Sequence, residues 1–186
     1  RDVYKRQVVN DEAMGASMAL NYLLEKNHKD ILFVRGKDSY SYDVKEKVYT
    51  EIMDDLNNFN PQNIINIGNG NSSETVDNTV NIFLNVLKAS TATAVLACND
   101  LMAVGVLNAC KKLNIDVPDK LSIIGFDNID LSKFVEPKLT TIDQNMFLLG
   151  SNAATLLLEK IECDNSCSKR IILMNTLIER DTVTAI

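Results

Sequence analysis

Tryptophan is absent from this sequence, histidine occurs once, and aromatic residues make up only 6% of its 186 residues. Aromatic platforms on which a sugar ring could stack are therefore scarce. The single histidine, His28, has no Ser or Cys nucleophile motif nearby, which favours a structural role at a helix end over catalysis. A metal-binding cluster and a phosphate-binding loop are also missing, so the sequence gives no reason to expect an enzyme, a metal or a cofactor.

An excess of positive charge and a long hydrophobic run are missing as well. Lysine and arginine number 19 against 25 aspartates and glutamates, which gives a formal net charge of −6. An acidic segment does not itself grip DNA or an anionic membrane, and no apolar run approaches the roughly 20 residues of a membrane-spanning helix. The hydrophobic content of 46% is nevertheless enough for a packed core in one or two domains.

The cysteines point to a reducing compartment. Cys98 and Cys110 fall on apolar positions, where free thiols behave as small core residues. Cys163 and Cys167 lie in a polar loop with no histidine near them, which makes a poor metal site. A disulfide between them is possible but not required, and a cytoplasmic location is the simpler interpretation.

The most informative stretch is a strand, a helix and a second strand between residues 92 and 129. Residues 94–97 and 121–126 are short and apolar, as expected of parallel strands buried on both faces. Asn99 and Asp100 follow the first strand, and Asp127 follows the second. Ligands of open α/β sheets bind at this rim. The alternative is that Asn99 and Asp100 cap the helix and Asp127 begins a turn.

The rest of the chain alternates in the same way and predicts an α/β fold. Strands are expected at residues 8–9, 31–34, 64–67, 139–142, 171–174 and 176–178, and the helices include 43–56 and 145–161. A helix from Asn10 should bury Met14, Met18, Leu20, Leu23 and Leu24. The glycine-rich loop 68–73 lacks the last glycine of a dinucleotide-binding motif and the lysine of a phosphate loop, so we interpret it as part of a binding cleft.

Three collinear motifs carry a resemblance to a known family. They are CNDLMAVG from Cys98, VPDKLSIIGFDN from Val117 and PKLTTIDQ from Pro137. This arrangement resembles the sensor domain of LacI/GalR-type transcriptional repressors, and the likeness extends from about Val8 to Thr182. The resemblance implies a class I periplasmic-binding-protein-like fold, in which two α/β subdomains, each a parallel sheet flanked by helices, enclose an effector cleft.

The resemblance also implies where an effector would bind. Its expected contacts are Ser39, Ser41, Lys45, Asn99, Asp127 and Gln144. Lys45 stands where the family usually has arginine. Lysine offers only a point charge, whereas arginine offers a planar fork of hydrogen-bond donors. The alternative for Lys45 is a solvated lysine on a charged helix face. The implied dimer interface includes Val104 and Phe134, for which ordinary core packing is the alternative.

By the same resemblance, one subdomain is nearly complete and the other is truncated. Residues 11–143 and 176–186 are expected to form the first, and residues 8–10 and 144–175 a remnant of the second. Residues 1–7 match the translation of a sequencing adapter and are set aside. The helix at 145–161 should then expose an apolar stripe and make the chain less stable than a full sensor.

The function implied is the effector-sensing and dimerising domain of a repressor. A small, sugar-like metabolite would close the cleft of a homodimer, and DNA would be contacted only through a helix-turn-helix outside this sequence. The alternative is an exported sugar-binding protein that serves a transporter. The gene upstream would distinguish the two, because a helix-turn-helix marks the first and a signal peptide the second.

Overall fold

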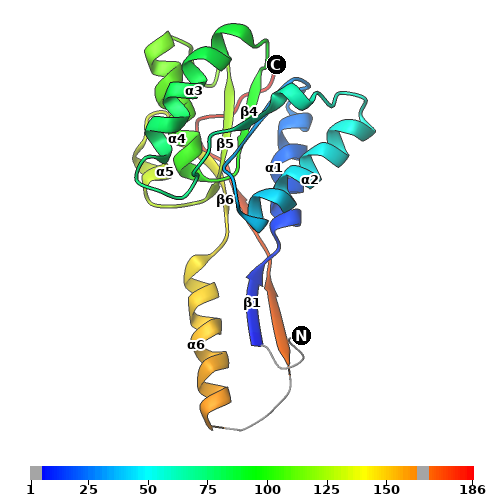
Figure 1. The fold of residues 1–186 in the computed structure, drawn as a ribbon, viewed down its shortest axis with the longest axis vertical. Coiled ribbons are helices and arrows are strands. Elements are labelled where there is room, and N and C mark those ends of the chain that lie inside the picture. Colours follow the sequence, from blue (N-terminus) through cyan, green and yellow to red (C-terminus); the bar gives the residue numbers. More distant parts are fainter. Residues whose placement is uncertain (1–5, 163–167) are drawn as a thin grey trace.

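The computed structural model describes residues 6–162 and 168–186, which form a large body and a small body (Figure 1). The large body contains a six-stranded sheet in the order β3-β2-β4-β5-β6-β8. Its strands are β2 (Ile31–Arg35), β3 (Ile64–Asn66), β4 (Ala94–Ala97), β5 (Ser122–Asp127), β6 (Thr140–Asp143) and β8 (Thr176–Ile178). All neighbouring strands are parallel except β8, which pairs antiparallel with β6. The expected α/β class is therefore confirmed.

Helices cover both faces of this sheet. In Figure 1, α1 and α2 lie on one side of the strands, and α3 and α4 lie on the other. The helices of this body are α1 (Glu12–Glu25), α2 (Tyr40–Asp55), α3 (Thr75–Ala89), α4 (Asp100–Leu113) and the short α5 (Leu131–Phe134), with a 3-10 turn at Pro61–Asn63. Because both faces are covered, every residue of β4 is buried, and the strand needs no alternation of polar and apolar side chains.

His28 has the structural role expected from the sequence. It is 1% exposed, its Nδ1 lies 2.9 Å from Thr93 Oγ1, and its Nε2 lies 2.9 Å from the Thr184 carbonyl. Burial lowers the pKa of His28, so the neutral ring is favoured in this position. The ring therefore ties the end of α1 to the C-terminal segment. Asn27 precedes it with φ of 70°, a left-handed conformation that asparagine tolerates at a helix exit.

The small body consists of two parallel strands and one helix. β1 (Arg6–Asn10) pairs with β7 (Lys169–Leu173), and α6 (Met146–Glu162) lies beside them (Figure 1). Arg6 and Gln7, which the sequence interpretation set aside, form the first two positions of β1. Pairing of this kind uses backbone groups and does not depend on which side chains are present.

The apolar spacing of α6 predicts a core stripe of Leu149, Ala153, Leu156 and Leu157, and this prediction is mostly wrong. Leu156 is the one residue of this helix that is buried, while Ala153 is exposed and Leu157 is 60% exposed. Two strands offer too little surface to cover a helix of 17 residues. The expected exposed apolar surface is therefore present, and it includes Met146, Phe147, Leu148, Leu157, Leu158 and Ile161.

Two helices differ from the prediction in detail. α2 begins at Tyr40, three residues before the predicted start, so that Ser39 is its N-cap and Ser41 lies in its first turn. The buried face of α1 includes Gly15, Ala16 and Ala19, while Met14, Met18 and Leu24 are only partly buried. A methyl group on Gly15 would lie 2.7 Å from the ring of Phe126, so the small side chains let α1 approach the sheet closely.

The remaining expectations concern cysteines, metals and membranes. Cys98 and Cys110 are free and buried, as predicted, whereas Cys163 and Cys167 lie outside the described residues. Within residues 6–162 and 168–186, no cluster of His, Cys, Asp and Glu could hold a metal ion. None of the helices in the same ranges combines the length and apolar character needed to cross a membrane.

Candidate functional site

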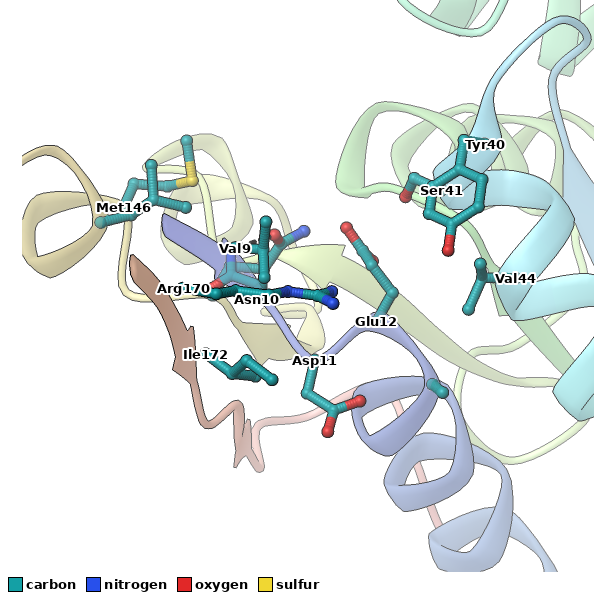
Figure 2. Close-up of a pocket in the computed structure, with 13 residues that line it drawn as sticks. Val9, Asn10, Asp11, Glu12, Tyr40, Ser41, Val44, Met146, Arg170 and Ile172 are labelled. Carbon is teal, nitrogen blue, oxygen red and sulfur yellow. Dashed lines mark hydrogen bonds between the residues drawn. The ribbon is translucent and has the colours of Figure 1, made fainter. Parts of the chain in front are cut away.

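A cavity of about 530 Å³ lies where the two bodies meet. The chain passes between the bodies three times, from β1 to α1, from β6 to α6 and from β7 to β8. The polar residues that line the cavity come from these crossings, from β7 and from the start of α2, and they include Asn10, Glu12, Ser41, Gln144 and Arg170. Figure 2 shows Glu12 and Arg170 extending into the gap, with Tyr40, Ser41 and Val44 facing them from α2.

A relay of hydrogen bonds joins two of the crossings to the tip of β5. Asn10 Nδ2 donates to Gln144 Oε1 at 2.6 Å, and Gln144 Nε2 donates to Asp127 Oδ1 at 2.5 Å. Gln144 is 8% exposed, so its amide is held by its two neighbours rather than by solvent. The relay therefore places Asp127 one hydrogen bond behind the wall of the cavity.

Asp127 combines an unusual backbone with a perturbed carboxyl group. Its φ of 111° lies in the left-handed region, which non-glycine residues rarely adopt. Burial raises the pKa of Asp127 to about 6, the positive charge of Lys45 opposes that shift, and the negative charge of Glu12 adds to it. A carboxyl group of this kind gains from a hydrogen-bond donor brought close to it, because a donor stabilises the ionised form.

Lys45 is neither a solvated lysine nor part of the cavity lining. It is 2% exposed, and its Nζ lies 3.0 Å from the Cys98 carbonyl oxygen and 3.5 Å from the centre of the Phe126 ring. Its ion-pair partner is Glu12, whose Oε2 lies 3.1 Å from Nζ. The solvated alternative is therefore wrong, because the ammonium group is enclosed between α2, α1 and β5 and needs Glu12 to balance its charge.

Two buried acceptor atoms of cavity-lining residues lack a hydrogen bond. They are Asn10 Oδ1 and Glu12 Oε2, neither of which has a hydrogen-bond partner within the described chain. Glu12 Oε2 is close to Lys45 Nζ, but the angles are outside the hydrogen-bond range, so the contact is electrostatic only. A buried acceptor without a donor is destabilising by about 1–3 kcal/mol. At Glu12 Oε2 the positive charge of Lys45 offsets this effect.

The sequence interpretation missed both of these residues. Asn10 ends a strand, and Glu12 begins a helix, where an acidic side chain is expected for its interaction with the helix dipole. Asp11 is the N-cap, and its side chain accepts from the Met14 backbone at 2.9 Å, which leaves Glu12 free to face the cavity. The sequence does contain one signal for Glu12. It is a second acidic residue directly after Asp11, which already caps the helix, so the carboxylate of Glu12 is not needed for capping.

Asn99 serves the fold rather than the cavity wall. Its Oδ1 accepts from the Met102 backbone at 2.9 Å, and its Nδ2 donates to the Gly70 carbonyl at 2.8 Å. It is 5% exposed and does not line the cavity, so the capping alternative describes its contacts. The same bonds hold the glycine-rich loop 68–73 against α4, and this loop also lies outside the lining.

Asp100, beside Asn99, is fully buried and anchors the segment after β5. Its two carboxylate oxygens accept from Thr141 Oγ1 at 2.5 Å and from the Ile129 backbone at 2.9 Å. Burial raises the pKa of Asp100 to about 7, and the nearby charge of Asp127 adds to the shift. The hydrogen bonds from Thr141 and Ile129 act in the opposite direction, because they favour the ionised form.

The structure thus separates the eight residues singled out in the sequence. Ser41 and Gln144 line the cavity, Asp127 and Lys45 lie directly behind it, and Ser39 and Asn99 are outside its lining. Of the two expected dimer residues, Phe134 is 81% exposed on α5. Val104 is 6% exposed on α4, which packs against α3, so core packing describes its present surroundings.

Comparison with known proteins places these features in a family. Residues 20–183 match the model of the periplasmic binding protein-like domain. Relatives include the HTH-type transcriptional repressor PurR of Vibrio atlanticus, which is 30% identical over 179 residues, 95% of this chain and 52% of the relative. The chain therefore spans about half the length of the curated relatives it matches.

Solved structures give the same picture. A LacI family transcriptional regulator from Enterococcus faecium with bound ribose superimposes with a TM-score of 0.87 at 26% identity, covering 100% of this chain and 68% of that one. The transcriptional regulator CelR in complex with cellobiose has a TM-score of 0.86 at 23% identity, covers 98% of this chain and 55% of that chain, and supports the fold alone. These relatives are regulators and not enzymes.

Proposed function

Because the chain belongs to the periplasmic binding protein-like domain family, in the form found in LacI-type regulators, we propose that it senses a small effector for a DNA-binding transcriptional repressor. The relatives that support this proposal are repressors and regulators, and they do not favour the alternative of an exported binding protein for a transporter. The cavity between the two bodies is the proposed effector site.

The observation that carries the proposal is the group of polar side chains, Asn10, Glu12 and Ser41, that line the cavity between the two bodies. The carboxylate of Glu12 and the amide oxygen of Asn10 accept hydrogen bonds, and the hydroxyl groups of a polyhydroxylated ligand supply donors at close spacing. Ser41 faces this wall from α2 and can both donate and accept. A sugar-like ligand therefore fits the lining better than an apolar one, because an apolar ligand would leave these polar side chains without hydrogen-bond partners.

Arg170 extends the set of contacts to the small body. Its guanidinium group points into the gap in Figure 2 and has no hydrogen bond or ion pair within the described residues. A ligand held by Glu12 and Ser41 on one side and by Arg170 on the other would contact both bodies. Such a ligand binds the closed arrangement better than an open one and shifts the population toward closure.

Closure offers a route from ligand to DNA. The relay from Asn10 through Gln144 to Asp127 spans two crossings, so a change in the angle between the bodies alters this relay. In the proposed homodimer, which would use the exposed Phe134 and adjoining residues of α4 and α5, closure would change the spacing of two DNA-reading domains. Ser39, Lys45 and Asn99 then act as residues that position α2 and the loop 68–73.

A thermal-shift screen tests this proposal. Sugars, nucleosides and sugar phosphates are added singly to the protein, and the melting temperature is recorded. A ligand that binds only the folded state raises the melting temperature by mass action, and a concentration of 100 times Kd stabilises by about 2.7 kcal/mol. At least one polyhydroxylated compound is expected to raise it. If no compound in the three classes does so, the effector-sensing assignment is wrong.

A further inference from the structure

The segment that follows β5 has a strained backbone. Asp127 and Asn128 are consecutive residues with positive φ, at 111° and 52°. Residues other than glycine rarely adopt such a conformation, and it persists only where the surrounding structure holds it in place. Asn128 tolerates it better than most residues, because a short amide side chain suits the left-handed region. The groups that hold this segment therefore decide where the Asp127 carboxyl group lies.

Arg180 holds the segment from outside the strand. It follows β8, and its Nη2 donates to Asn128 Oδ1 at 2.7 Å. Its Nη1 donates to the Leu139 carbonyl oxygen at 2.6 Å and to Ser132 Oγ at 3.0 Å. The guanidinium group thus ties the residue after Asp127 to α5 on one side and to the residue before β6 on the other. These three acceptors are neutral, so the contact depends on the planar fork of donors more than on pairing of charge.

On its inner side the segment is held through its backbone. The Asn128 N–H lies 3.4 Å from Thr141 Oγ1, and the Ile129 N–H donates to Asp100 Oδ2 at 2.9 Å. Neither bond reaches the Asn128 side chain. Of the two donors that do so within the described chain, Arg180 is the closer, at 2.7 Å against 3.4 Å for a hydroxyl group of α5. Loss of Arg180 should therefore let Asn128 leave its left-handed conformation.

We propose that Arg180 is a positioning residue of the proposed effector site. Through Asn128 it holds the backbone that directs the Asp127 carboxyl group toward Gln144 at the crossing from β6 to α6. The consequence for an effector rests on the proposed function, whereas the positioning of Asp127 can be measured without a ligand. Lysine should not replace arginine here, because a single ammonium nitrogen does not reproduce the fork that reaches both sides of the segment.

The experiment follows the side-chain carboxyl carbon of Asp127 by NMR as the pH is changed, in the wild type and in Arg180→Lys, Arg180→Ala and Asn128→Ala. In the wild type the midpoint should lie at about 6, because burial raises the pKa of Asp127. In each variant the segment should relax and expose the carboxyl group to water, so the midpoint should fall by about one pH unit toward 3.8. The charges of Lys45 and Glu12, which act on Asp127, are the same in all of these proteins.

Asp100 separates charge from geometry in the same spectra. The positive charge of Arg180 lowers the pKa of Asp100 against the effect of burial. Arg180→Ala should therefore raise the midpoint of Asp100, whereas Arg180→Lys, which keeps the charge, should leave it unchanged. Arg180→Ala and Asn128→Ala break the same contact, so the double variant should lower the Asp127 midpoint no further than either change alone.

Arg35→Lys is the control, because it also replaces an arginine fork by a point charge. Arg35 ends β2, and its guanidinium group donates to Gly36, Asp43 and Glu46 rather than to the segment after β5. This variant should leave the Asp127 midpoint at its wild-type value. If Arg35→Lys lowers the midpoint as much as Arg180→Lys does, the effect is general destabilisation and the inference is wrong.

Two further results would overturn the inference. The first is an Asp127 midpoint that stays at the wild-type value in the Arg180 and Asn128 variants, and the second is additive shifts in the double variant. Where Arg180→Ala is too unstable to study, Asn128→Ala gives the same readout with the arginine in place. If the midpoint moves as expected but no compound of the thermal-shift screen binds, the effector role fails while the positioning of Asp127 by Arg180 stands.

Discussion

At the scale of single residues, the site depends on a few buried polar atoms that lack a hydrogen-bond partner or carry a charge that another residue must balance. Glu12 balances the buried ammonium group of Lys45 at 3.1 Å and also lines the cavity. Sequence motifs predicted Ser41 and Gln144, and the structure places both at the cavity. Asn10 and Glu12 were missed because a strand end and a helix start explain them locally. Only the packing of distant segments brings them together.

The Glu12–Lys45 pair gives the first stability prediction. Glu12→Ala leaves the buried charge of Lys45 without its partner, and the free energy of unfolding should fall by about 3 kcal/mol. Glu12→Ala combined with Lys45→Met, which removes both charges, should recover most of this loss. Urea unfolding of the two variants measures the difference. If the double variant is less stable than Glu12→Ala alone, Lys45 does not depend on Glu12.

The carboxyl groups of Asp127 and Asp100 give a prediction about pH. Their pKa values are raised from 3.8 to about 6 and about 7, so the folded state holds these protons more tightly than the unfolded chain. Their contribution to stability is therefore fully present below pH 3.8 and is lost as the pH rises through about 6 and 7. Asp127→Asn removes one of the two groups. The free energy of unfolding should therefore fall less between pH 4 and pH 7 in Asp127→Asn than in the wild type, by about 1 kcal/mol.

This pH difference is measured as melting temperature against pH. Asp54→Asn, which changes an exposed carboxylate on α2, is the control and should leave the profile parallel to that of the wild type. A profile of Asp127→Asn that is also parallel to the wild type would show that the carboxyl group of Asp127 titrates normally.

At the scale of elements, the sequence predicted the strands and most helices well, because buried parallel strands and capped helices have strong local signals. The start of α2 was placed three residues late, because Tyr40 resembles loop sequence and Ser39 does not use its side chain as a cap. The core stripe of α6 failed for a different reason. The apolar spacing is present, but the described chain provides only the two-stranded sheet of β1 and β7 to cover it.

Close packing between α4 and β5 gives a prediction at this scale. A methyl group on Gly125 would overlap the Asp100 carboxylate and would lie 2.9 Å from Leu139. Gly125→Ala should therefore lower the free energy of unfolding by about 2 kcal/mol, the usual effect of overpacking a core. Gly150→Ala is the matched control, because a methyl group there meets no atom and an exposed helix gains up to about 1 kcal/mol. Similar destabilisation by both variants would contradict the tight contact at Gly125.

At the scale of the whole molecule, a well-packed body and a thinly covered one share three crossings of the chain (Figure 1). The family motifs predicted this class of fold. They lie in the large body, where helices cover both faces of the sheet. The expected subdomain boundaries, with 8–10 and 144–175 on one side, stay a prediction. The lining of the cavity could be predicted from sequence only in part, because its wall combines residues as far apart in the chain as Asn10 and Arg170.

Because α6 is covered less than the helices of the large body, we expect it to open more readily. Met146, Phe147, Leu157 and Ile161 of α6 are each more than half exposed, so the helix gains little from burial. Backbone amides of α6 should exchange with deuterium at least 100-fold faster than those of α4, a difference of about 2.7 kcal/mol in opening free energy. Mass spectrometry of peptides from the two helices measures it. Equal protection, or a single cooperative transition at high temperature, would show that the small body is as firmly held as the large one.

The central claim is that Asn10 and Glu12 present acceptors to the hydroxyl groups of a ligand in the cavity between the bodies. It is tested most directly by calorimetric titration of wild type and Asn10→Ala with the sugar that gives the largest thermal shift. Because Asn10→Ala removes one acceptor and breaks the relay to Gln144 and Asp127, affinity should fall by about tenfold or more. Unchanged affinity in Asn10→Ala would contradict the claim.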